Sequence, residues 1–530
     1  MGKFRSSDNG DRVCAEQPDI RVSVTNFGPV RNGHVDLRPL SVFVGPSNTG
    51  KTYLAILVYA LRRILGGFPR LPIMYSYQNR FFGQDTDLDL SVTTADALVE
   101  EVQGTLRRLE VEGGSFTYSG LPKSAREIAQ SFLNDPNSLG SILSSQLQRC
   151  FDLNSVAELV RFSGQDNMEV SLFASERKRS LWRLQLEVTT EETATKGLIE
   201  DMDLFPNRRP ESVSNFRQGL SGFSDLVKMR QGQEPVWNSQ FLLEHFEELL
   251  EVATLHRYSD THYLPAARSG IIQSHRVIAS SLVERSTRGG LEHFPELPTF
   301  SGVMADFLQK LILFEEAQGN QNSVVEAAEA LEREALAGQI RATRSQVGGY
   351  PEFAYRPSGM GEDIRLTRAS SMVSELAPVV LFLRGAVSPG DMLIIEEPEA
   401  HLHPAAQTQM ARTLASLVRA GVRVVVTTHS DWLLMEIANL MREGELQEIS
   451  GKQVSDKGGS SALLPSEVGV WLFREDDDYS GSTIEEIPFN RSEGIEPEEY
   501  ESVAEALYNR SAALQNQFQE LAGAAAREQE

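Results

Sequence analysis

The chain has 530 residues, of which 41% are hydrophobic and 23% charged, and these values exclude a fully disordered or collagen-like protein. Its formal net charge of −24 repels nucleic acid over most of the surface, so any DNA contact requires a local basic patch. No apolar run reaches the ~18 residues of a membrane helix, and the polar start has no secretory signal. The two cysteines, Cys14 and Cys150, cannot form a disulfide framework. These features predict a cytoplasmic protein without a membrane segment.

The first part of the chain predicts a hairpin, a buried strand and a helix. Residues 1–18 are polar and are expected to be flexible. Periodicity and turn residues then predict the following elements: a strand at 20–24, a turn at 26–29, a second strand at 34–37, a short apolar strand at 40–44 and a helix at 51–60.

From about 85 to 335 the pattern is mostly helical, with one strand at 261–270. Continuous apolar strands then alternate with helices, which predicts a mainly parallel α/β sheet. The expected helices are 95–109, 241–253, 323–336, 371–383, 405–419 and 498–518; the expected strands are 391–397, 422–429 and 468–473, after short alternations over 339–367.

A loop after the strand at 40–44 fits the phosphate-binding pattern G-x-x-x-x-G-K-[ST]. It reads Gly45-Pro46-Ser47-Asn48-Thr49-Gly50-Lys51-Thr52. The glycines let backbone N–H groups turn toward a β-phosphate, and the next helix directs its positive end there. In this pattern Lys51 reaches the β- and γ-phosphates, and Thr52 offers a hydroxyl to Mg²⁺. Because a strand precedes the loop and a helix follows it, ATP with Mg²⁺ is predicted over a chance glycine-rich turn.

Two acids, Glu396 and Glu397, end a buried strand. One carboxylate at such a position can bind the Mg²⁺ of a P-loop site, and a second can orient or deprotonate the attacking water. The alternative is a solvated acidic turn. His429 ends the next strand, where an imidazole can donate to a γ-phosphate; the alternative is a structural residue at a strand end.

Two other segments suggest binding. His401 and His403 lie beside acids and suggest a transition-metal site, although two imidazoles are few for one. The segment 176–183, ERKRSLWR, combines an aromatic residue with cations. It is either a surface helix or hairpin, or a contact for nucleic acid.

The sequence resembles ATPases of the ABC type related to SMC and RecF proteins, and within them the OLD-like "AAA family ATPases" of prokaryotic antiphage systems. VTNFGPV, VFVGPSNTGKT, LIIEEPEAHLHP and VVVTTHS carry the resemblance, which covers about residues 20–60, 260–275 and 340–435. It implies an α/β fold: a P-loop ATPase head with a mixed or parallel sheet, flanking helices and a large helical insertion. That insertion accounts for the long separation between Lys51 and Glu396.

The resemblance also implies roles for single residues. Glu396 matches the Walker B acid, which together with Thr52 would hold Mg²⁺, although many relatives have Asp there. Glu397 matches the catalytic glutamate, His429 the switch histidine, and Lys51 the lysine of Walker A. The segment 398–404 matches the D-loop, which passes the dimer interface.

Two further matches are less complete. Ser370 and Ser371 stand where ABC ATPases carry the signature that grips the γ-phosphate of a partner's ATP, but Met372 replaces the usual glycine. The alternative is an ordinary serine N-cap. Arg268 or Gln273 would be the Q-loop contact, with Gln78 as a competitor.

The expected organisation has six parts. These are a flexible N-terminus (1–18), a lobe of the head with Walker A (19–84), a helical insertion (85–255), a strand plus a helical arm (256–345), a lobe with the signature-like segment, Walker B and the switch histidine (346–445), and a C-terminal strand and helix (446–530).

OLD nucleases carry a C-terminal Toprim domain. The acids at 474–478 superficially resemble one of its elements, but the second element is missing, and a solvated acidic loop is expected instead. The resemblance therefore implies an ATPase or sensor component whose effector is a separate protein.

Three functions remain open from the sequence. The preferred one is an ATP-hydrolysing switch that forms a homodimer or a higher homo-oligomer around ATP, in antiphage defence or DNA maintenance. The second is an ATP-dependent scaffold that sequesters an effector with little turnover. The third is a RecF-like DNA-repair ATPase that binds DNA directly.

Overall fold

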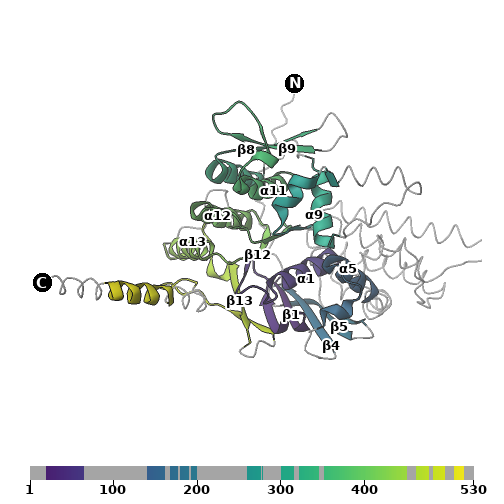
Figure 1. Ribbon diagram of the computed structural model, residues 1–530. Coiled ribbons are helices and arrows are strands. Elements are labelled where there is room, and N and C mark those ends of the chain that lie inside the picture. The colour runs from purple at the N-terminus through teal and green to yellow at the C-terminus, as the bar shows by residue number, and fades with distance from the viewer. Residues whose placement is uncertain are drawn as a thin grey trace, which may run out of the picture.

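The computed structural model describes residues 19–64, 140–160, 167–176, 179–189, 193–199, 260–275, 277–278, 300–315, 322–344, 351–450, 461–476, 481–495 and 506–518 (Figure 1). Gln78 and the helices expected at 95–109 and 241–253 lie outside these residues. Within them the chain has the predicted α/β fold, with one large sheet and helices beside it.

The described elements are as follows. The helices are α1 (Lys51–Ile64), α5 (Ser141–Phe151), α9 (Gly302–Ile312), α10 (Ser323–Leu331), α11 (Ser371–Gly385), α12 (Pro404–Arg419) and α13 (Asp431–Ile449), with further helical residues at 268–275 and 506–518. Short helical turns are η5 (Val156–Leu159), η6 (Glu332–Leu336), η7 (Leu366–Arg368) and η8 (Pro465–Glu467). The strands of the large sheet are β1 (Asp19–Phe27), β2 (Val30–Asp36), β3 (Leu40–Val44), β4 (Asn167–Glu176), β5 (Arg179–Thr189), β6 (Thr193–Ile199), β7 (Thr261–Leu264), β11 (Met392–Glu396), β12 (Arg423–Thr427), β13 (Val468–Glu475) and β14 (Ser482–Glu486). A small sheet holds β8 (Gly338–Arg344), β9 (Pro351–Pro357) and β10 (Ile364–Arg365).

The large sheet has eleven described strands in the order β6-β5-β4-β1-β2-β14-β13-β3-β12-β11-β7. One half is parallel: β13, β3, β12, β11 and β7 run the same way. The other half is mostly antiparallel, from the β13–β14 hairpin outward to β6. The parallel pairs align Phe43 with Thr427 and Thr427 with Glu396, so the carboxyl ends of β3, β12 and β11 lie side by side.

Helices cover both faces of the parallel half. Every residue of β3, β11 and β12 is buried, as expected for strands with helices above and below. Alternate residues of these strands join one large apolar core with α10, α11, α12 and α13. On the other face α1 lies against β7, β11 and β12 (Figure 1). By contrast, β1 buries alternate residues from Ile20 to Val24, which the alternation in its sequence predicts.

The structure corrects three sequence predictions. The region 85–255, expected to be a helical insertion, also contains the strands β4, β5 and β6, which extend the sheet beside β1. The strand expected at 261–270 ends at Leu264, and residues 268–275 are helical. Beyond His429 the chain also contains α13 and β14, which were not predicted. α13 has apolar residues on both its buried and its exposed sides, so its sequence does not show the one-sided apolar pattern that predicts a helix.

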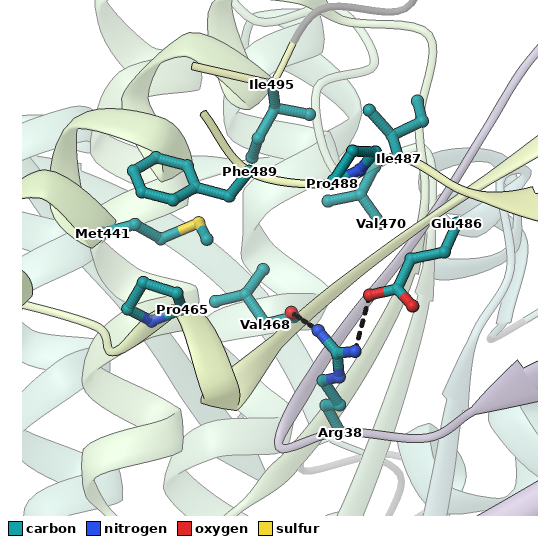
Figure 2. A pocket seen from close by; sticks show the side chains of 10 residues that line it. All are labelled: Arg38, Met441, Pro465, Val468, Val470, Glu486, Ile487, Pro488, Phe489 and Ile495. Carbon is teal, nitrogen blue, oxygen red and sulfur yellow. Dashed lines mark hydrogen bonds and ion pairs between the residues drawn. The ribbon is translucent and has the colours of Figure 1, made fainter. Parts of the chain in front are cut away.

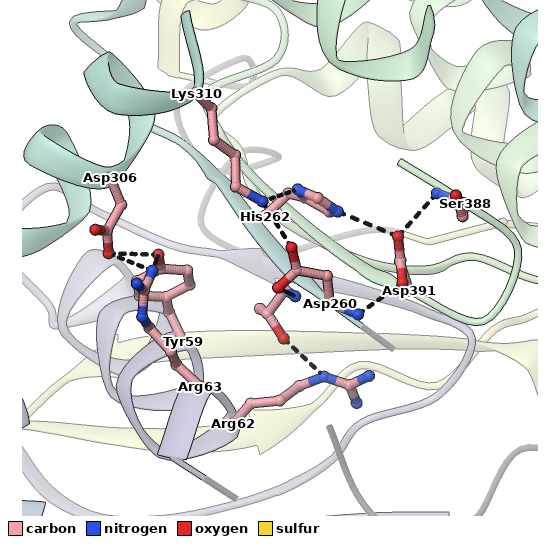
Figure 3. A network of polar contacts seen from close by, with 10 residues as sticks. Tyr59, Arg62, Arg63, Asp260, His262, Asp306, Lys310, Ser388 and Asp391 are labelled. Atoms are coloured by element: carbon pink, nitrogen blue, oxygen red, sulfur yellow. Dashed lines mark hydrogen bonds and ion pairs between the residues drawn. The ribbon is translucent and has the colours of Figure 1, made fainter. Parts of the chain in front are cut away.

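A polar network closes the amino ends of β7 and β11 (Figure 3). His262 lies between Lys310 and Asp391: its Nδ1 is 2.7 Å from the Lys310 ammonium, and its Nε2 is 3.1 Å from the Asp391 carboxylate. Asp391 also accepts hydrogen bonds from the backbone N–H of Asp260 (2.7 Å) and Ser388 (2.8 Å). Since a lysine only donates, Nδ1 accepts and Nε2 carries the proton. Both ring nitrogens of His262 therefore have partners in this network.

A second cluster ties together three helices that precede and follow the 65–139 region. Asp306 of α9 is 4% exposed and accepts hydrogen bonds from Tyr59 (2.8 Å) and Arg63 (2.6 Å) of α1. Arg149 of α5 reaches the same carboxylate, with one N–O distance of 3.0 Å. One buried carboxylate thus holds α1, α5 and α9 together (Figure 3 shows the α1–α9 part).

Replacing Asp306 with Ala is expected to lower the free energy of unfolding by about 2–3 kcal/mol. Breaking a buried ion pair typically costs about 3–5 kcal/mol, and the two partly exposed arginines reduce that figure here. Thermal or denaturant unfolding of the purified chain measures the change. Asp363→Ala is the control, because Asp363 forms a half-exposed pair with Arg356 and its loss should change stability by less than about 1 kcal/mol. Equal losses in the two variants would contradict the role given to Asp306.

Candidate functional site

The phosphate-binding loop at 45–52 has the backbone geometry that its sequence predicts. Gly45 and Gly50 adopt φ values of +128° and +101°, which side chains rarely allow. A Cβ on Gly45 would lie 2.4 Å from the carbonyl oxygen of Phe473 in β13, so the loop also packs too closely for any larger residue. α1 begins at Lys51 and directs its amino end at the loop. The Gly residues are therefore required by both conformation and contact.

The Lys51 side chain lies within this loop. It is 6% exposed, and its ammonium donates to the carbonyl oxygens of Gly45 (2.8 Å) and Pro46 (2.5 Å). Thr49 donates to Pro46 (2.9 Å), and Ser482 of β14 donates to the carbonyl of Thr49 (2.6 Å). β14 thus holds the phosphate loop through Ser482, and sequence patterns do not reveal this contact.

The two distant motifs meet at one edge of the sheet. Beyond the ladder, Thr428 donates its N–H to Phe43 (3.0 Å), and Glu397 donates its N–H to Thr427 (2.9 Å). Only β12 separates β3 from β11, so these strands lie about 10 Å apart at the usual interstrand spacing. The fold therefore places the end of the strand before the phosphate loop and the end of the strand before Glu397 at the same edge of the sheet.

Glu396 is held by the segment that follows β7. Its carboxylate accepts hydrogen bonds from the hydroxyl of Tyr263 and from the N–H of Ala266 (3.1 Å). Burial raises the pKa of Glu396 above its usual value, while these two hydrogen bonds oppose the rise. Burial and the adjacent Glu396 charge together raise the pKa of Tyr263, which stays a neutral donor. The alternative of a solvated acidic turn does not fit Glu396.

Glu397 differs from its neighbour. Its side chain is exposed, and its φ of +42° is left-handed, which is rare for a residue with a side chain. Such a conformation costs about 1–3 kcal/mol and persists where surrounding contacts impose it. The turn therefore presents the Glu397 carboxylate outward at the edge where Glu396 is turned inward.

The acids also connect to the histidine. Glu399 accepts hydrogen bonds from the hydroxyl of Thr428 (2.7 Å) and the N–H of His429 (2.7 Å). Burial, and secondarily the positive charge of Lys51, lower the pKa of His429, while Glu397 opposes the shift. His429 is therefore neutral at pH 7 and lies within electrostatic reach of both Lys51 and Glu397.

The oxygen donors suit Mg²⁺ better than a transition metal. Thr52 offers an exposed hydroxyl at the start of α1, and Glu396 keeps unused lone pairs on a carboxylate that accepts two hydrogen bonds. His401 is exposed, and His403 caps α12 by accepting a hydrogen bond from Ala405 (3.3 Å). Among the described residues no three His, Cys, Asp or Glu side chains are grouped to hold a metal.

The signature-like serines lie at the start of α11. Ser370 is the N-cap and accepts a weak hydrogen bond from Val373 (3.4 Å), so the structural interpretation applies to it. Ser370 and Ser371 are both exposed, whereas Met372 packs against the core. The two serines therefore remain available to a second molecule at the protein surface.

The Q-loop candidates have different environments. Arg268 is fully buried and donates hydrogen bonds to carbonyl oxygens inside the protein, so it does not reach a nucleotide at the surface. Gln273 is exposed and donates to Ser374 of α11 (3.1 Å). Of the two, only Gln273 has the exposure that a nucleotide contact needs.

Within the segment 176–183, Glu176 ends β4 and residues 179–183 begin β5, and these two strands pair antiparallel; residues 177–178 lie outside the described part of the chain. Arg183 and Arg21 both lie over the ring of Phe173, with their guanidinium carbons 5.5 and 5.8 Å from the ring centre. Glu169 and Glu187 are paired on the same face of these strands, so the face is not uniformly basic. It offers little support for a nucleic-acid contact.

A small cavity of about 220 Å³ lies away from this edge (Figure 2). Arg38 borders it and donates to the carbonyl of Val468 (2.6 Å) and to Glu486 (2.5 Å). Arg38 precedes β3 and Val468 begins β13, so the cavity opens at the amino edge of the parallel strands. It is not part of the P-loop site.

Among the described helices, none has the length and apolar character needed to cross a lipid bilayer.

Comparison with known proteins gives one family match. Residues 285–434 match the family described as AAA ATPase domain. The match includes the segments with Glu396, Glu397 and His429 and begins after the P-loop. No curated protein matches the sequence.

Several solved structures are similar over most of their length. An SMC head bound to the C-winged helix domain of ScpA has 8% identity and a TM-score of 0.40, covering 90% of this chain and 100% of that chain. The SMC head domain from Thermotoga maritima has 9% identity and a TM-score of 0.34, covering 89% and 99%. A Pyrococcus yayanosii SMC head with a coiled coil and joint has 10% identity and a TM-score of 0.37, covering 90% and 98%. The match to the AAA ATPase domain over residues 285–434 agrees with the ATPase resemblance of the sequence.

Proposed function

We propose that the protein is an ATP-hydrolysing molecular switch. The observation that carries the proposal is the parallel order β3-β12-β11, which brings the P-loop, His429 and the Glu396–Glu397 pair to one edge. A triphosphate on the loop N–H groups and the amino end of α1 would have Lys51 beside its β- and γ-phosphates. The ATPase-domain match supports the same class.

The geometry suggests how the residues would divide the reaction. Glu397, exposed at the edge, would orient the attacking water and accept its proton. Lys51 would balance charge that develops on the phosphate oxygens. Neutral His429 would donate one N–H to the γ-phosphate. Thr52 and Glu396 would hold Mg²⁺, which when bound neutralises charge on the phosphates.

Two copies would complete the site. Ser370 and Ser371 are exposed at the amino end of α11, on a surface that a second molecule can reach. The amino end of a helix favours anions, so these serines would grip the γ-phosphate of the partner's ATP. Binding would close a homodimer or larger assembly, and hydrolysis would open it. A role in antiphage defence or DNA maintenance, with a separate effector, is the biological setting we propose.

Lys51→Ala is expected to reduce ATP turnover by a factor of about 100 or more, because a charged donor to the phosphates is lost. Phosphate release at saturating ATP and Mg²⁺ measures it. Lys310→Ala, which changes a lysine at the opposite edge of the sheet, is the control and should retain turnover. Full activity of Lys51→Ala would refute the site.

Glu397→Gln is expected to retain ATP binding and lose hydrolysis, so the closed assembly should accumulate only with ATP. Light scattering with and without ATP measures the mass. Assembly that ignores nucleotide would favour the scaffold function instead. Tight, salt-sensitive DNA binding by the wild type would favour the direct DNA-repair function.

A mixing experiment tests the contribution from the second copy. Lys51→Ala and Ser371→Arg should each be inactive alone, since one lacks the P-loop cation and the other blocks the trans contact. Mixed in equal amounts, they should recover about a quarter of wild-type turnover, because half of the dimers are mixed and each has one complete site. No recovery, in subunits shown to exchange, would contradict a shared site.

Tyr263→Phe is expected to move the acid limb of the pH–turnover profile to higher pH. The hydroxyl of Tyr263 stabilises the Glu396 carboxylate and lowers its pKa. Without it, the burial-raised pKa of Glu396 rises further, so the Mg²⁺-binding carboxylate is lost earlier as the pH falls. Activity on the alkaline plateau should change little. A limb that stays in place or moves to lower pH would contradict this role.

A further inference from the structure

We propose that Arg268 is a positioning residue that fixes the Glu396–Glu397 turn and joins it to the start of α11. The inference rests on the proposed function, since it concerns how that site is held and regulated. Arg268 is fully buried, so it would affect hydrolysis through the residues that it holds and not through contact with the nucleotide.

Every nitrogen of the Arg268 guanidinium has a partner. One terminal nitrogen donates to the carbonyl oxygens of Glu396 (2.7 Å) and Pro265 (3.3 Å), and the other donates to the carbonyl oxygen of Glu397 (3.0 Å). Nε lies 3.2 Å from the carbonyl oxygen and 3.1 Å from the carboxylate of Glu375. One side chain thus contacts the main chain of both acids and of α11.

The positive charge of Arg268 is buried, although burying a charge is costly. Arg268 is 0% exposed and is among the largest fully buried side chains. Burial lowers its pKa, and the negative charges of Glu375 and three other glutamates oppose that shift. A buried ion pair seldom stabilises a fold more than apolar residues of the same volume would. The role of Arg268 is therefore better sought in the positions that it gives to the groups it contacts than in added stability.

That geometry bears on Glu397. The left-handed conformation at Glu397 is strained, and its carbonyl is held by Arg268 while its N–H is held by Thr427 (2.9 Å). Both sides of the residue are thereby fixed, which sets the direction of its exposed carboxylate. Since the attacking water must be oriented closely, loosening this turn would slow chemistry without removing a phosphate contact.

The helical residues 268–275 that contain Arg268 contact α11 at two adjacent positions. Arg268 pairs with Glu375, and Gln273 donates to Ser374 (3.1 Å). Both positions lie within about a turn of Ser371, at the end of the helix where the partner's phosphate would bind. A shift of α11 on contact with a second copy would therefore be transmitted through Arg268 to the Glu397 main chain.

The test compares Arg268→Met with Arg423→Met. Arg423 is also buried and donates to the carbonyl of Leu37, but it lies at the amino edge of β12, away from the site. We expect kcat of Arg268→Met to fall about 10- to 100-fold, as for other residues that orient a reacting group. ATP affinity should change less than about threefold, because the P-loop is intact. Arg423→Met should lose stability but keep kcat.

A double variant separates positioning from general damage. If Arg268 acts through Glu397, then Arg268→Met added to Glu397→Gln should cause no further loss of the residual kcat. Multiplied losses would overturn the inference. Arg268→Lys keeps one cation but not the fork, so kcat should recover only in part; it also serves as the test variant if Arg268→Met does not fold. Wild-type kcat in either folded Arg268 variant refutes the inference alone, whereas an inactive wild type refutes the proposed function.

Discussion

Parallel pairing of three short strands is the constraint on which this structure depends. β3 lies hundreds of residues before β11 and β12 in the chain, yet their ladder leaves all three carboxyl ends at one edge. Parallel strands require long crossover connections, and a crossover tolerates insertion because the cost of loop closure grows slowly with length. The chain can therefore place a large segment between its phosphate loop and its acids without moving either.

The chemistry at that edge comes from unequal burial of similar groups. Glu396 and Glu399 are held inward by hydrogen bonds from Tyr263, Ala266, Thr428 and His429, whereas Glu397 faces outward. Burial raises the pKa of both Glu396 and Glu399, and their hydrogen bonds oppose the rise. A left-handed residue makes this division possible, since it turns the chain between Glu396 and Glu397.

The segment after β7 provides much of the support. Tyr263, Ala266 and Arg268 contact the acids, and Gln273 contacts α11. β7 lies beside β11 at the end of the sheet, so its following turn packs directly on the turn that ends β11. This placement links the acids to the helix that carries the exposed serines. The network around Asp391 and His262 secures the opposite ends of the same two strands.

The sequence alone determined the local elements and the chemistry of the motifs. The strand at 40–44 matches β3, and the acids end a buried strand. The phosphate loop has glycines at the positions whose φ values require them. Each of these features depends on residues close in sequence. Periodicity also anticipated α11 and α12, although it missed α13 and the strands β4–β6.

Only the tertiary structure decided which groups meet. Neither the contact of Ser482 with the phosphate loop nor that of Tyr263 with Glu396 has a sequence signal, since both join strands far apart in the chain. Arg268 stood in the sequence as a possible nucleotide contact, and the fold buries it against carbonyl groups instead. Side-chain direction depends on packing between strands and helices, and a linear pattern does not contain that packing.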